Sequence, residues 1–401
     1  MTKDQFIKEL KKKVKSLKVP QEYWGINLDE FFQYQWNIYL SIRETAGKTT
    51  QSLLLGLCAA SILPEHYGTF AYLRNDVAQI TRGHIETLFG TVENFGYIAK
   101  IFNNRWNGVL YKAQQRKFYL VNRDPEGSII DTSTEPICSV HAVEKWMDDK
   151  SSVNLPTCGL IIYDEILDTN RATYRLFTEL LNQISTIGRP MSETRRPWLH
   201  ILGLGNNTDA YGWIFDDLMI SEDIPYLSYG GNITFKTEYN TTGVCRLLEL
   251  GEPQKKRLAD KNIPFLGFPG KKAASFTGAE AWSGKVYRHP DFELDYENNC
   301  KFRRAYVFHR GRYIQFDLFA DPEVGKYVFC HFASKPKLDD NIIFTLEPSR
   351  SKDIYGFGKY EKNEKILRVC KQFVSCLQEN RFYYASNRVG SLIDDYIKNI
   401  V

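Results

Sequence analysis

The sequence lacks several patterns that would assign it to common classes of protein. Its eight cysteines are scattered, and no two have the CxxC spacing typical of a structural zinc site. No apolar run approaches the roughly 20 residues that a membrane-spanning helix needs. The basic N-terminus has no apolar segment of a secretory signal, and no internal repeat or low-complexity tract is found. We therefore expect no structural zinc, no membrane partner and a reducing cytoplasm.

What is present indicates a folded chain with more than one domain. The chain has 401 residues, of which 43% are hydrophobic and 14% aromatic, enough to build sizeable cores. The formal net charge is +4, which does not identify a partner by itself.

Positive charge is concentrated at the N-terminus. Residues 1–18 contain seven lysines but only the acids Asp4 and Glu9. Apolar residues at helical spacing lie between the lysines and predict an amphipathic helix that ends before Pro20. Such a helix is either a solvated cap on the domain or a contact with nucleic acid or with a neighbouring subunit.

The next part of the chain alternates between apolar strands and helical segments. Strands are predicted at 36–40, 69–73, 158–163 and 198–204, helices at 53–60, 76–102 and 174–187, and a hairpin at 109–121. Strands that are apolar throughout and alternate with helices favour a mainly parallel sheet covered on both faces.

The composition changes after about residue 235. Residues 246–285 are rich in Gly, Pro and Lys, and they are followed by three short strands at 305–308, 313–319 and 326–332 and helices at 361–379 and 388–400. We predict an α/β domain over 1–240, a linker lobe over 241–290 and a second α/β domain over 291–401.

A phosphate-binding loop is predicted between the strand at 36–40 and the following helix. The backbone of Glu44, Thr45, Ala46, Gly47 and Thr50 would surround the phosphates at a helix N-terminus. Lys48 would reach the β- and γ-phosphates of ATP, and the Thr49 hydroxyl would be a ligand of Mg²⁺. Ile42 stands where such a loop usually has its first glycine.

Two further strands end in polar residues that fit the same site. Residues 160–165 form an apolar strand that delivers Asp164, expected to hold Mg²⁺, and Glu165, expected to orient the attacking water. Asn206 follows the strand at 198–204 and is a candidate sensor of the γ-phosphate. The alternatives are a buried strand followed by a capping acid, and an ordinary asparagine turn. The ATPase interpretation requires Lys48 and the two acids to converge on one triphosphate, from neighbouring strands.

Basic residues are candidates for stabilising the transition state. Arg189, after the helix at 174–187, and Lys150 are the main candidates, and Arg195 and Arg196 are weaker ones. For each, the alternative is a solvated surface charge.

Together these elements resemble the DNA-packaging ATPases of small tailed phages that prime replication with a terminal protein, the Salasmaviridae kind, which are distant relatives of large terminase subunits. Four segments carry the similarity: the strand 70–74 with its terminal arginine, the strand 160–165, residues 180–182 with Arg189 shortly after them, and residues 205–206. Large terminases often carry an arginine in a degenerate loop before Gly-Lys-Thr, as Arg43 stands here. By this resemblance, Arg43 would contact the γ-phosphate in cis, Arg189 would be the arginine finger, and Lys150 would act in trans.

The resemblance implies more than the residues alone indicate. It implies an additional-strand (ASCE) P-loop ATPase domain and a C-terminal RNase H-like α/β domain. It implies a homomeric ring, expected to be a pentamer, at the portal of a viral capsid, moving double-stranded DNA with MgATP. The expected location is the host cytoplasm and, transiently, the procapsid portal vertex. Members also dock on a structural packaging RNA, and for this chain that is left open.

One departure from terminase nucleases concerns the C-terminal domain. Two-metal nucleases of that fold need a carboxylate on their first strand, and 303–308 has none. We therefore expect no nuclease activity. The basic residues of this segment suggest contact with a phosphate backbone or a solvated hairpin (Lys301, Arg303, Arg304, Arg310, Arg312).

Two other functions are open from the sequence. One is a helicase, or a terminase with a working nuclease. The other is a structural nucleic-acid-binding protein with an inactive loop, for which Ile42 is the best support.

Overall fold

The computed structural model describes residues 1–20, 23–41, 47–145, 155–167, 179–187, 199–206, 213–237, 241–249, 287–292, 294, 303–309, 311–322, 325–336, 342–345, 354–355 and 364–400. The chain divides into two compact units, each described by itself below. The first contains Met1–Ile220 and Leu227–Trp282, and the second contains Ser221–Tyr226 and Ser283–Val401.

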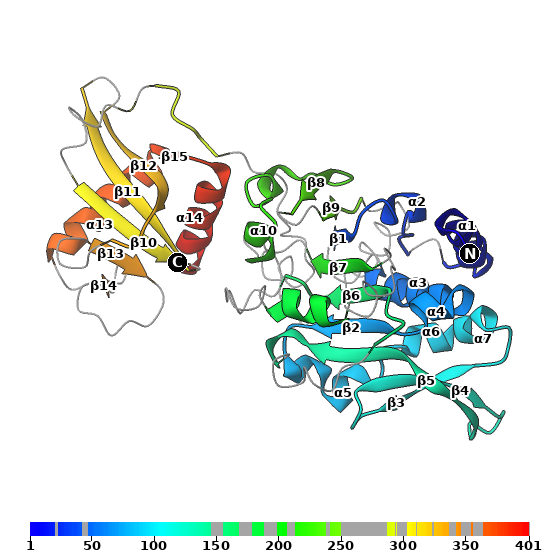
Figure 1. Ribbon diagram of the computed structural model, residues 1–401. Helices are drawn as coiled ribbons and strands as arrows, with labels where there is room; N and C mark the ends of the chain where they lie inside the picture. The colour runs from blue at the N-terminus through cyan, green and yellow to red at the C-terminus, as the bar shows by residue number, and fades with distance from the viewer. Residues whose placement is uncertain are drawn as a thin grey trace. The chain divides into compact units, whose positions relative to one another are not determined.

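A nine-stranded sheet is the centre of the first unit, in the order β3-β4-β5-β2-β6-β7-β1-β9-β8 (Figure 1). Its strands are β1 (Trp36–Ser41), β2 (Phe70–Arg74), β3 (Gly108–Lys112), β4 (Lys117–Arg123), β5 (Ile129–Ala142), β6 (Leu160–Asp164), β7 (His200–Asn206), β8 (Asn232–Lys236) and β9 (Thr242–Leu247). The six strands from β5 to β9 in this order are parallel, and β3, β4 and β8 are antiparallel edges. The predicted mainly parallel sheet is confirmed.

The strand order corrects one expectation about the site. Strand β7 lies between β1 and β6, so the strand before Lys48 and the strand that carries Asp164 are not neighbours. Ser41 pairs with Asn206, and Asp164 pairs with Leu204. Because all these strands run in parallel, their carboxyl ends meet at one edge of the sheet.

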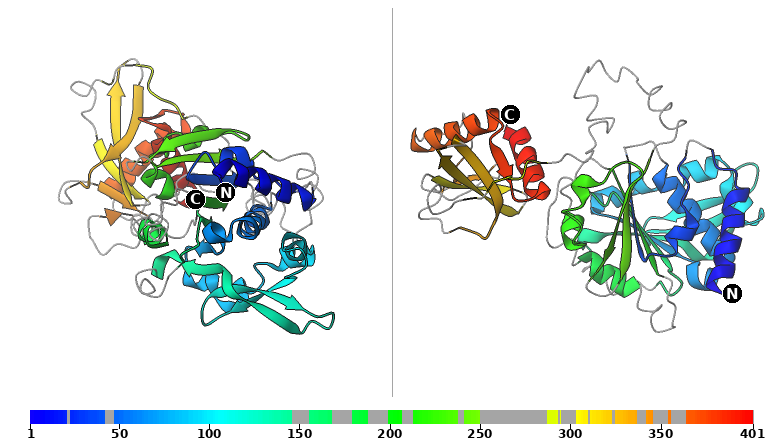
Figure 2. Two further views of the ribbon diagram at one scale, coloured as in Figure 1. Left: turned by 45° about the vertical axis from the view of Figure 1, so that its right-hand side comes forward. Right: turned by 90° about the horizontal axis from the view of Figure 1, so that it is seen from above.

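Helices cover the sheet on both faces (Figure 2, right). They are α1 (Lys3–Ser16), α2 (Leu28–Phe31), α3 (Lys48–Ile62), α4 (Pro64–Tyr67), η1 (Val77–Ile80), α5 (Arg82–Ile85), α6 (Gly90–Asn94), α7 (Tyr97–Ile101), η2 (Val143–Lys145), α10 (Trp213–Asp217) and the helical residues 179–187. The central helix is α3, whose residues from Gln51 to Ala60 are all buried. A helix that is apolar on every side is stable only when other elements surround it, and α1, α6 and α7 pack on α3.

The first unit departs from the prediction in several places. Residues 76–102 form the short helices η1, α5, α6 and α7 rather than one helix, and Gly96, at φ +64°, separates the last two. The long strand β5 was not predicted because residues 131–135 are polar, and residues 129–135 are all exposed or half-buried. The first unit extends beyond residue 240, because β9 pairs with β1. Most of the predicted linker lobe, residues 250–286, lies outside the described residues.

The second unit has a six-stranded sheet in the order β14-β13-β10-β11-β12-β15. Its elements are β10 (Arg303–His309), β11 (Arg312–Asp321), β12 (Gly325–Ala333), β13 (Ile342–Thr345), β14 (Ile354–Tyr355), β15 (Phe382–Tyr384), α13 (Glu364–Gln378), α14 (Asn387–Ile400) and η3 (Ile224–Tyr226). β10, β11 and β12 form an antiparallel meander, and β13, β14 and β15 add in parallel to their neighbours. The three predicted strands and both predicted helices are confirmed.

Both long helices of the second unit are amphipathic. In α13, Ile366, Val369, Cys370 and Phe373 are buried at helical spacing. Phe316 of β11 meets Phe373 edge to face, with ring centroids 5.3 Å apart. Among the described residues, no helix of either unit is long and apolar enough to cross a membrane.

Candidate nucleotide-binding site

The start of α3 has the backbone of an anion site. Gly47 precedes the helix at φ +62°, a left-handed conformation that favours glycine. A Cβ at this position would lie 2.3 Å from Cδ1 of Tyr23. Glycine has no side chain that could accept the N–H groups of the first turn. The N-terminus of a 15-residue helix, with its positive dipole end, therefore suits a bound anion.

Lys48 connects the helix to the carboxyl ends of two strands. Its Nζ donates to Oγ of Ser41 at 2.6 Å and to Oδ1 of Asn206 at 3.2 Å. Burial lowers the pKa of Lys48 to about 8, while the charge of Asp164 acts in the opposite direction. Lys48 and Asn206, two of the predicted site residues, are thus in contact, and the contact with Ser41 was not predicted.

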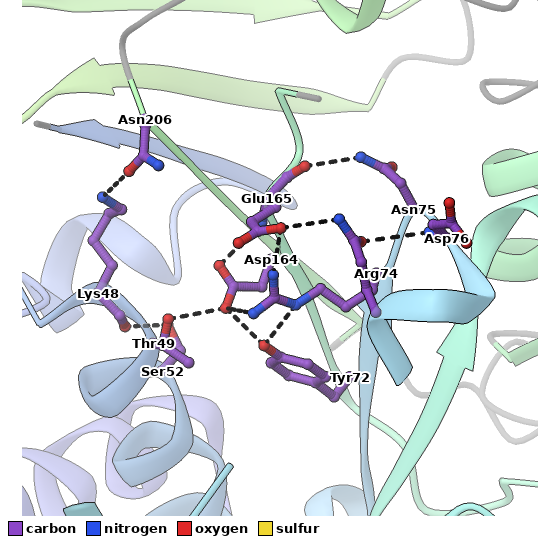
Figure 3. A network of polar contacts seen from close by, with 11 residues as sticks. Lys48, Thr49, Ser52, Tyr72, Arg74, Asn75, Asp76, Asp164, Glu165 and Asn206 are labelled. Atoms are coloured by element: carbon purple, nitrogen blue, oxygen red, sulfur yellow. Dashed lines mark hydrogen bonds and ion pairs between the residues drawn. The ribbon is translucent and has the colours of Figure 1, made fainter. Parts of the chain in front are cut away.

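Asp164 accepts hydrogen bonds from several elements (Figure 3). Its Oδ2 accepts from the Thr49 hydroxyl at 2.9 Å, the Tyr72 hydroxyl at 2.7 Å and Nη2 of Arg74 at 3.2 Å. Burial and the charge of Asp164 raise the pKa of Tyr72 well above its usual value, so its hydroxyl remains a donor. Residues 49 and 164, far apart in sequence, therefore place two oxygen ligands side by side.

Glu165 is held at the end of β6 by groups from β2 and η1. Nη1 of Arg74 lies 2.6 Å from Oε2 of Glu165, and Nε2 of Gln79 donates to the same oxygen at 3.1 Å. Asn75 donates to the Glu165 carbonyl at 2.9 Å. Glu165 itself has φ +58°, an uncommon conformation for a residue with a side chain. Several contacts thus hold a strained residue in place.

Arg74 is a residue of this site whose contacts were not predicted from the sequence. It contacts both acids, and its Nε also donates to the Tyr72 hydroxyl at 3.0 Å. Burial alone would lower the pKa of Arg74, but Asp164, Tyr72 and Glu165 raise it, so the guanidinium stays charged. In the sequence, Arg74 is seen only as the last residue of an apolar strand. The sequence does not show that this strand, β2, lies beside β6, which carries Asp164.

The donor set fits MgATP. Mg²⁺ prefers oxygen ligands, and it is commonly held by one or two protein groups together with phosphates and water. The hydroxyl of Thr49 and the carboxylate of Asp164 are such ligands, and the nearby start of α3 with Lys48 suits the phosphates. Thr50 lies in the first turn of the same helix.

Six predicted site residues lie outside the part of the chain that the structure describes. These are Arg43, Glu44, Thr45, Ala46, Lys150 and Arg189, and the weaker candidates Arg195 and Arg196 share this position. Gly47, Lys48, Thr49, Asp164, Glu165 and Asn206 are described and gather at the same edge of the sheet.

A separate polar cluster lies on the meander of the second unit. The carboxylate of Asp317 is fully buried and accepts from Nε of Arg304 at 2.9 Å and from Nε2 of Gln315 at 2.8 Å. Nε2 of His331 lies 3.2 Å from Oδ2 of the same acid. Burial would raise the pKa of Asp317, but these hydrogen bonds outweigh it and lower the pKa.

Comparisons with known proteins give matches among solved structures alone. No protein-family model and no curated protein matches the chain. The N-terminal domain of the DNA packaging ATPase from bacteriophage phi29 is 14% identical, with 57% of this chain and 97% of that chain covered and a TM-score of 0.40. The large terminase ATPase domain of Thermus phage P74-26 is also 14% identical, with 62% and 89% covered and a TM-score of 0.35. These scores describe loose superpositions, so the functional assignment depends on the site geometry of this chain.

Proposed function

We propose that the chain is a P-loop ATPase that uses MgATP to move viral double-stranded DNA into a preformed capsid. Residues from three places in the sequence carry the proposal. Thr49 contacts Asp164, and Lys48 contacts Asn206, all at the carboxyl edge of a parallel sheet. The strand β7, between β1 and β6, is the extra strand of the additional-strand class.

In this site the chain's own residues bind and orient the nucleotide. Lys48 and the backbone at the start of α3 attract the phosphates. Thr49 and Asp164 would hold Mg²⁺, and the bound ion would neutralise charge that develops on the phosphates. Glu165 orients the attacking water and accepts its proton. Asn206, next to Lys48, is positioned to sense the terminal phosphate.

We propose that Arg74 restrains the Glu165 carboxylate from acting on water. Oε2 of Glu165 is already occupied by Arg74 and Gln79, so that oxygen is not free to accept a proton from water. We propose that hydrolysis is faster when the contact between Arg74 and Glu165 opens and leaves this oxygen free as well. Because Arg74 ends β2 and Gln79 lies in η1, a movement of these two elements would change the contacts of Glu165 and thereby the rate of hydrolysis.

The remaining parts of the proposal come from the family resemblance. Subunits form a homomeric ring, expected to be a pentamer, on the portal or connector of the procapsid in the host cytoplasm. Arg189 reaches the site of the adjacent subunit, Lys150 acts in trans, and Arg43 contacts the γ-phosphate in cis. Double-stranded DNA passes through the ring, and a packaging RNA is a further candidate partner.

We also propose that the second unit is RNase H-like and has no nuclease activity. The strand order β14-β13-β10-β11-β12, a meander with two strands added in parallel beside its first, supports the fold. The buried Asp317 of β11 is occupied by Arg304, Gln315 and His331. A guanidinium in contact with this carboxylate competes with a metal ion. Metal-dependent cleavage of plasmid DNA by the purified protein would contradict this part.

The test of the proposed function is ATP turnover by the full chain with and without long duplex DNA, at several salt concentrations. The account expects stimulation by DNA of unrelated sequences, and weaker DNA binding as salt rises, because the backbone is the contact. ATP turnover that is the same with and without DNA would contradict the proposed translocation but not the proposed ATPase activity. No turnover under any condition would favour a structural nucleic-acid-binding protein instead.

A further inference from the structure

Tyr72 lies in the middle of β2, and its side chain is fully buried. It pairs with Ile162 of β6, and both side chains belong to a core cluster that includes the apolar residues of α3. Because side chains alternate between the two faces of a strand, Asp164, two residues after Ile162, and Arg74, two residues after Tyr72, lie on the same face. The hydroxyl of Tyr72 therefore reaches from the core to the carboxyl edge of the sheet, where the nucleotide site lies.

The two hydrogen bonds of the Tyr72 hydroxyl have a fixed direction (Figure 3). Nε of Arg74 donates to the hydroxyl oxygen at 3.0 Å, and a guanidinium has no acceptor. The single hydroxyl proton is therefore donated to Oδ2 of Asp164, at 2.7 Å. A phenylalanine would fill nearly the same volume of the core, so the difference between Tyr and Phe at this position lies in these two contacts.

The carboxylate of Asp164 is held at both oxygens. Oδ1 accepts from the backbone N–H of Glu165 at 3.0 Å, and Oδ2 accepts from the three side chains of Thr49, Tyr72 and Arg74. Of these three, Thr49 is the expected ligand of Mg²⁺, and Arg74 is a cation that a bound metal ion would repel. Tyr72 is thus the neutral side chain that orients the carboxylate without being a ligand itself.

The orientation of this carboxylate matters more for Mg²⁺ than for Ca²⁺. Mg²⁺ demands near-ideal octahedral geometry, whereas Ca²⁺ accepts irregular sets of oxygen ligands. Groups that form hydrogen bonds to a metal ligand orient it, and their removal typically lowers metal affinity by about 10–100-fold. Tyr72 suits this role because its ring is fixed in the core and its hydroxyl cannot turn away from Asp164 without disturbing the packing.

We propose that Tyr72 is a positioning residue of the metal site, whose hydroxyl holds the Asp164 carboxylate in the orientation that Mg²⁺ requires. The inference rests on the proposed binding of MgATP, and it adds to that function a residue that determines the affinity and selectivity of the site for the metal ion.

The test compares Tyr72→Phe with Tyr163→Phe in the full chain. Each variant removes one hydroxyl from a fully buried tyrosine and keeps the ring that packs in the core. Tyr163 is the matched control, because its side chain lies on the opposite face of β6 from Asp164 and its hydroxyl donates to Asn75. Binding of a fluorescent ATP analogue is titrated with Mg²⁺ and with Ca²⁺, and it is measured separately in excess EDTA.

The proposal predicts that Tyr72→Phe needs about 10–100-fold more Mg²⁺ than the unmodified protein for half-maximal binding of the nucleotide. Binding in EDTA should be the same in both, and the shift with Ca²⁺ should be smaller than with Mg²⁺. Tyr163→Phe should keep the Mg²⁺ midpoint of the unmodified protein. Because the hydroxyl acts through Asp164, Tyr72→Phe should add no further shift when it is combined with Asp164→Ala.

An unchanged Mg²⁺ midpoint in Tyr72→Phe, or an equal shift in Tyr163→Phe, would overturn the proposal. Equal losses of binding with Mg²⁺, with Ca²⁺ and in EDTA would overturn it too, because they would show a general disturbance of the site. The same holds if Tyr72→Phe shifts the midpoint equally with and without Asp164→Ala. All these outcomes leave the proposed ATPase intact, whereas an unmodified protein that binds no nucleotide with Mg²⁺ would contradict the proposed function and this inference with it.

Discussion

The pKa of Lys48 is subject to two opposing influences in the folded protein. Burial lowers its pKa to about 8, from a usual value of 10.5, whereas Asp164 favours the charged form. The unfolded chain therefore binds more protons than the folded one between these values, and stability rises with pH across that window. Phosphates at the start of α3 would favour the ammonium and raise its pKa again.

The first prediction follows from this shift. ATP affinity should decrease as pH rises above about 8, and binding near pH 8–9 should take up protons. The measurement is calorimetry in buffers with different ionisation enthalpies. Near pH 7, where Lys48 is already charged, the uptake should be close to zero. Equal uptake at both pH values would contradict the role assigned to Lys48.

Arg74 gives a second prediction at the scale of a residue. Replacing Arg74 with Ala removes the ion pair with Glu165, so we expect turnover without DNA to rise severalfold and stimulation by DNA to shrink. Gln79→Ala is the control, because it removes one hydrogen bond to the same oxygen and leaves the guanidinium. Steady-state ATPase rates with and without DNA measure both. If Arg74→Ala leaves the ATPase rate without DNA unchanged, Arg74 does not restrain Glu165.

At the scale of elements, the packing of α3 on β2 depends on one glycine. A Cβ at Gly56 would lie 2.7 Å from Cδ1 of Phe70, which is buried in β2. Gly56→Ala should therefore destabilise the protein by about 1–3 kcal/mol, although Ala is the better helix former.

Gly90, in α6, is the control for this substitution. Nothing lies within 4 Å of a Cβ there, so Gly90→Ala should be neutral or stabilising by up to about 1 kcal/mol. Urea unfolding of both variants gives the comparison. A Gly56→Ala variant as stable as the unmodified protein would mean that α3 can move away from β2 at no cost.

How much could be predicted differs between strands. β1, β2, β6 and β7 were predicted because they are buried on both faces and read as continuous apolar runs. β8 and β5 were not predicted. The residues of β8 alternate between exposed and half-buried, and the first half of β5 is exposed or half-buried and mostly polar. β9 lies between β1 and the edge strand β8, and its residues were assigned to the linker lobe.

Part of the candidate site could be predicted from the sequence for a similar reason. Lys48, Thr49, Asp164 and Asn206 could be predicted because each ends or follows an apolar strand, and the contacts among them agree with this. The contacts of Arg74, Tyr72 and Ser41 depend on which strands are neighbours. That order is a property of the folded sheet, and single segments do not encode it.

For the whole molecule, the assignment of Arg189 to a neighbouring subunit predicts the behaviour of mixed rings. Arg189→Ala should lower turnover by about 10³–10⁵-fold while ATP binding remains. Mixing this variant with Glu165→Gln subunits should restore part of the activity, since an intact Glu165 can then face an intact Arg189 from another subunit. Each variant alone is the control. Mixed rings that stay inactive would contradict the action in trans.

The central claim is that Lys48, Thr49 and Asp164 bind one MgATP and that Glu165 acts on it. The most direct measurement compares ATP binding and single-turnover hydrolysis in the unmodified protein, Glu165→Gln and Lys48→Ala. Glu165→Gln should bind ATP normally and hydrolyse it about 10²–10⁴-fold more slowly. Lys48→Ala should bind ATP far more weakly. Hydrolysis by Glu165→Gln at the unmodified rate, or unchanged ATP binding by Lys48→Ala, would contradict the account.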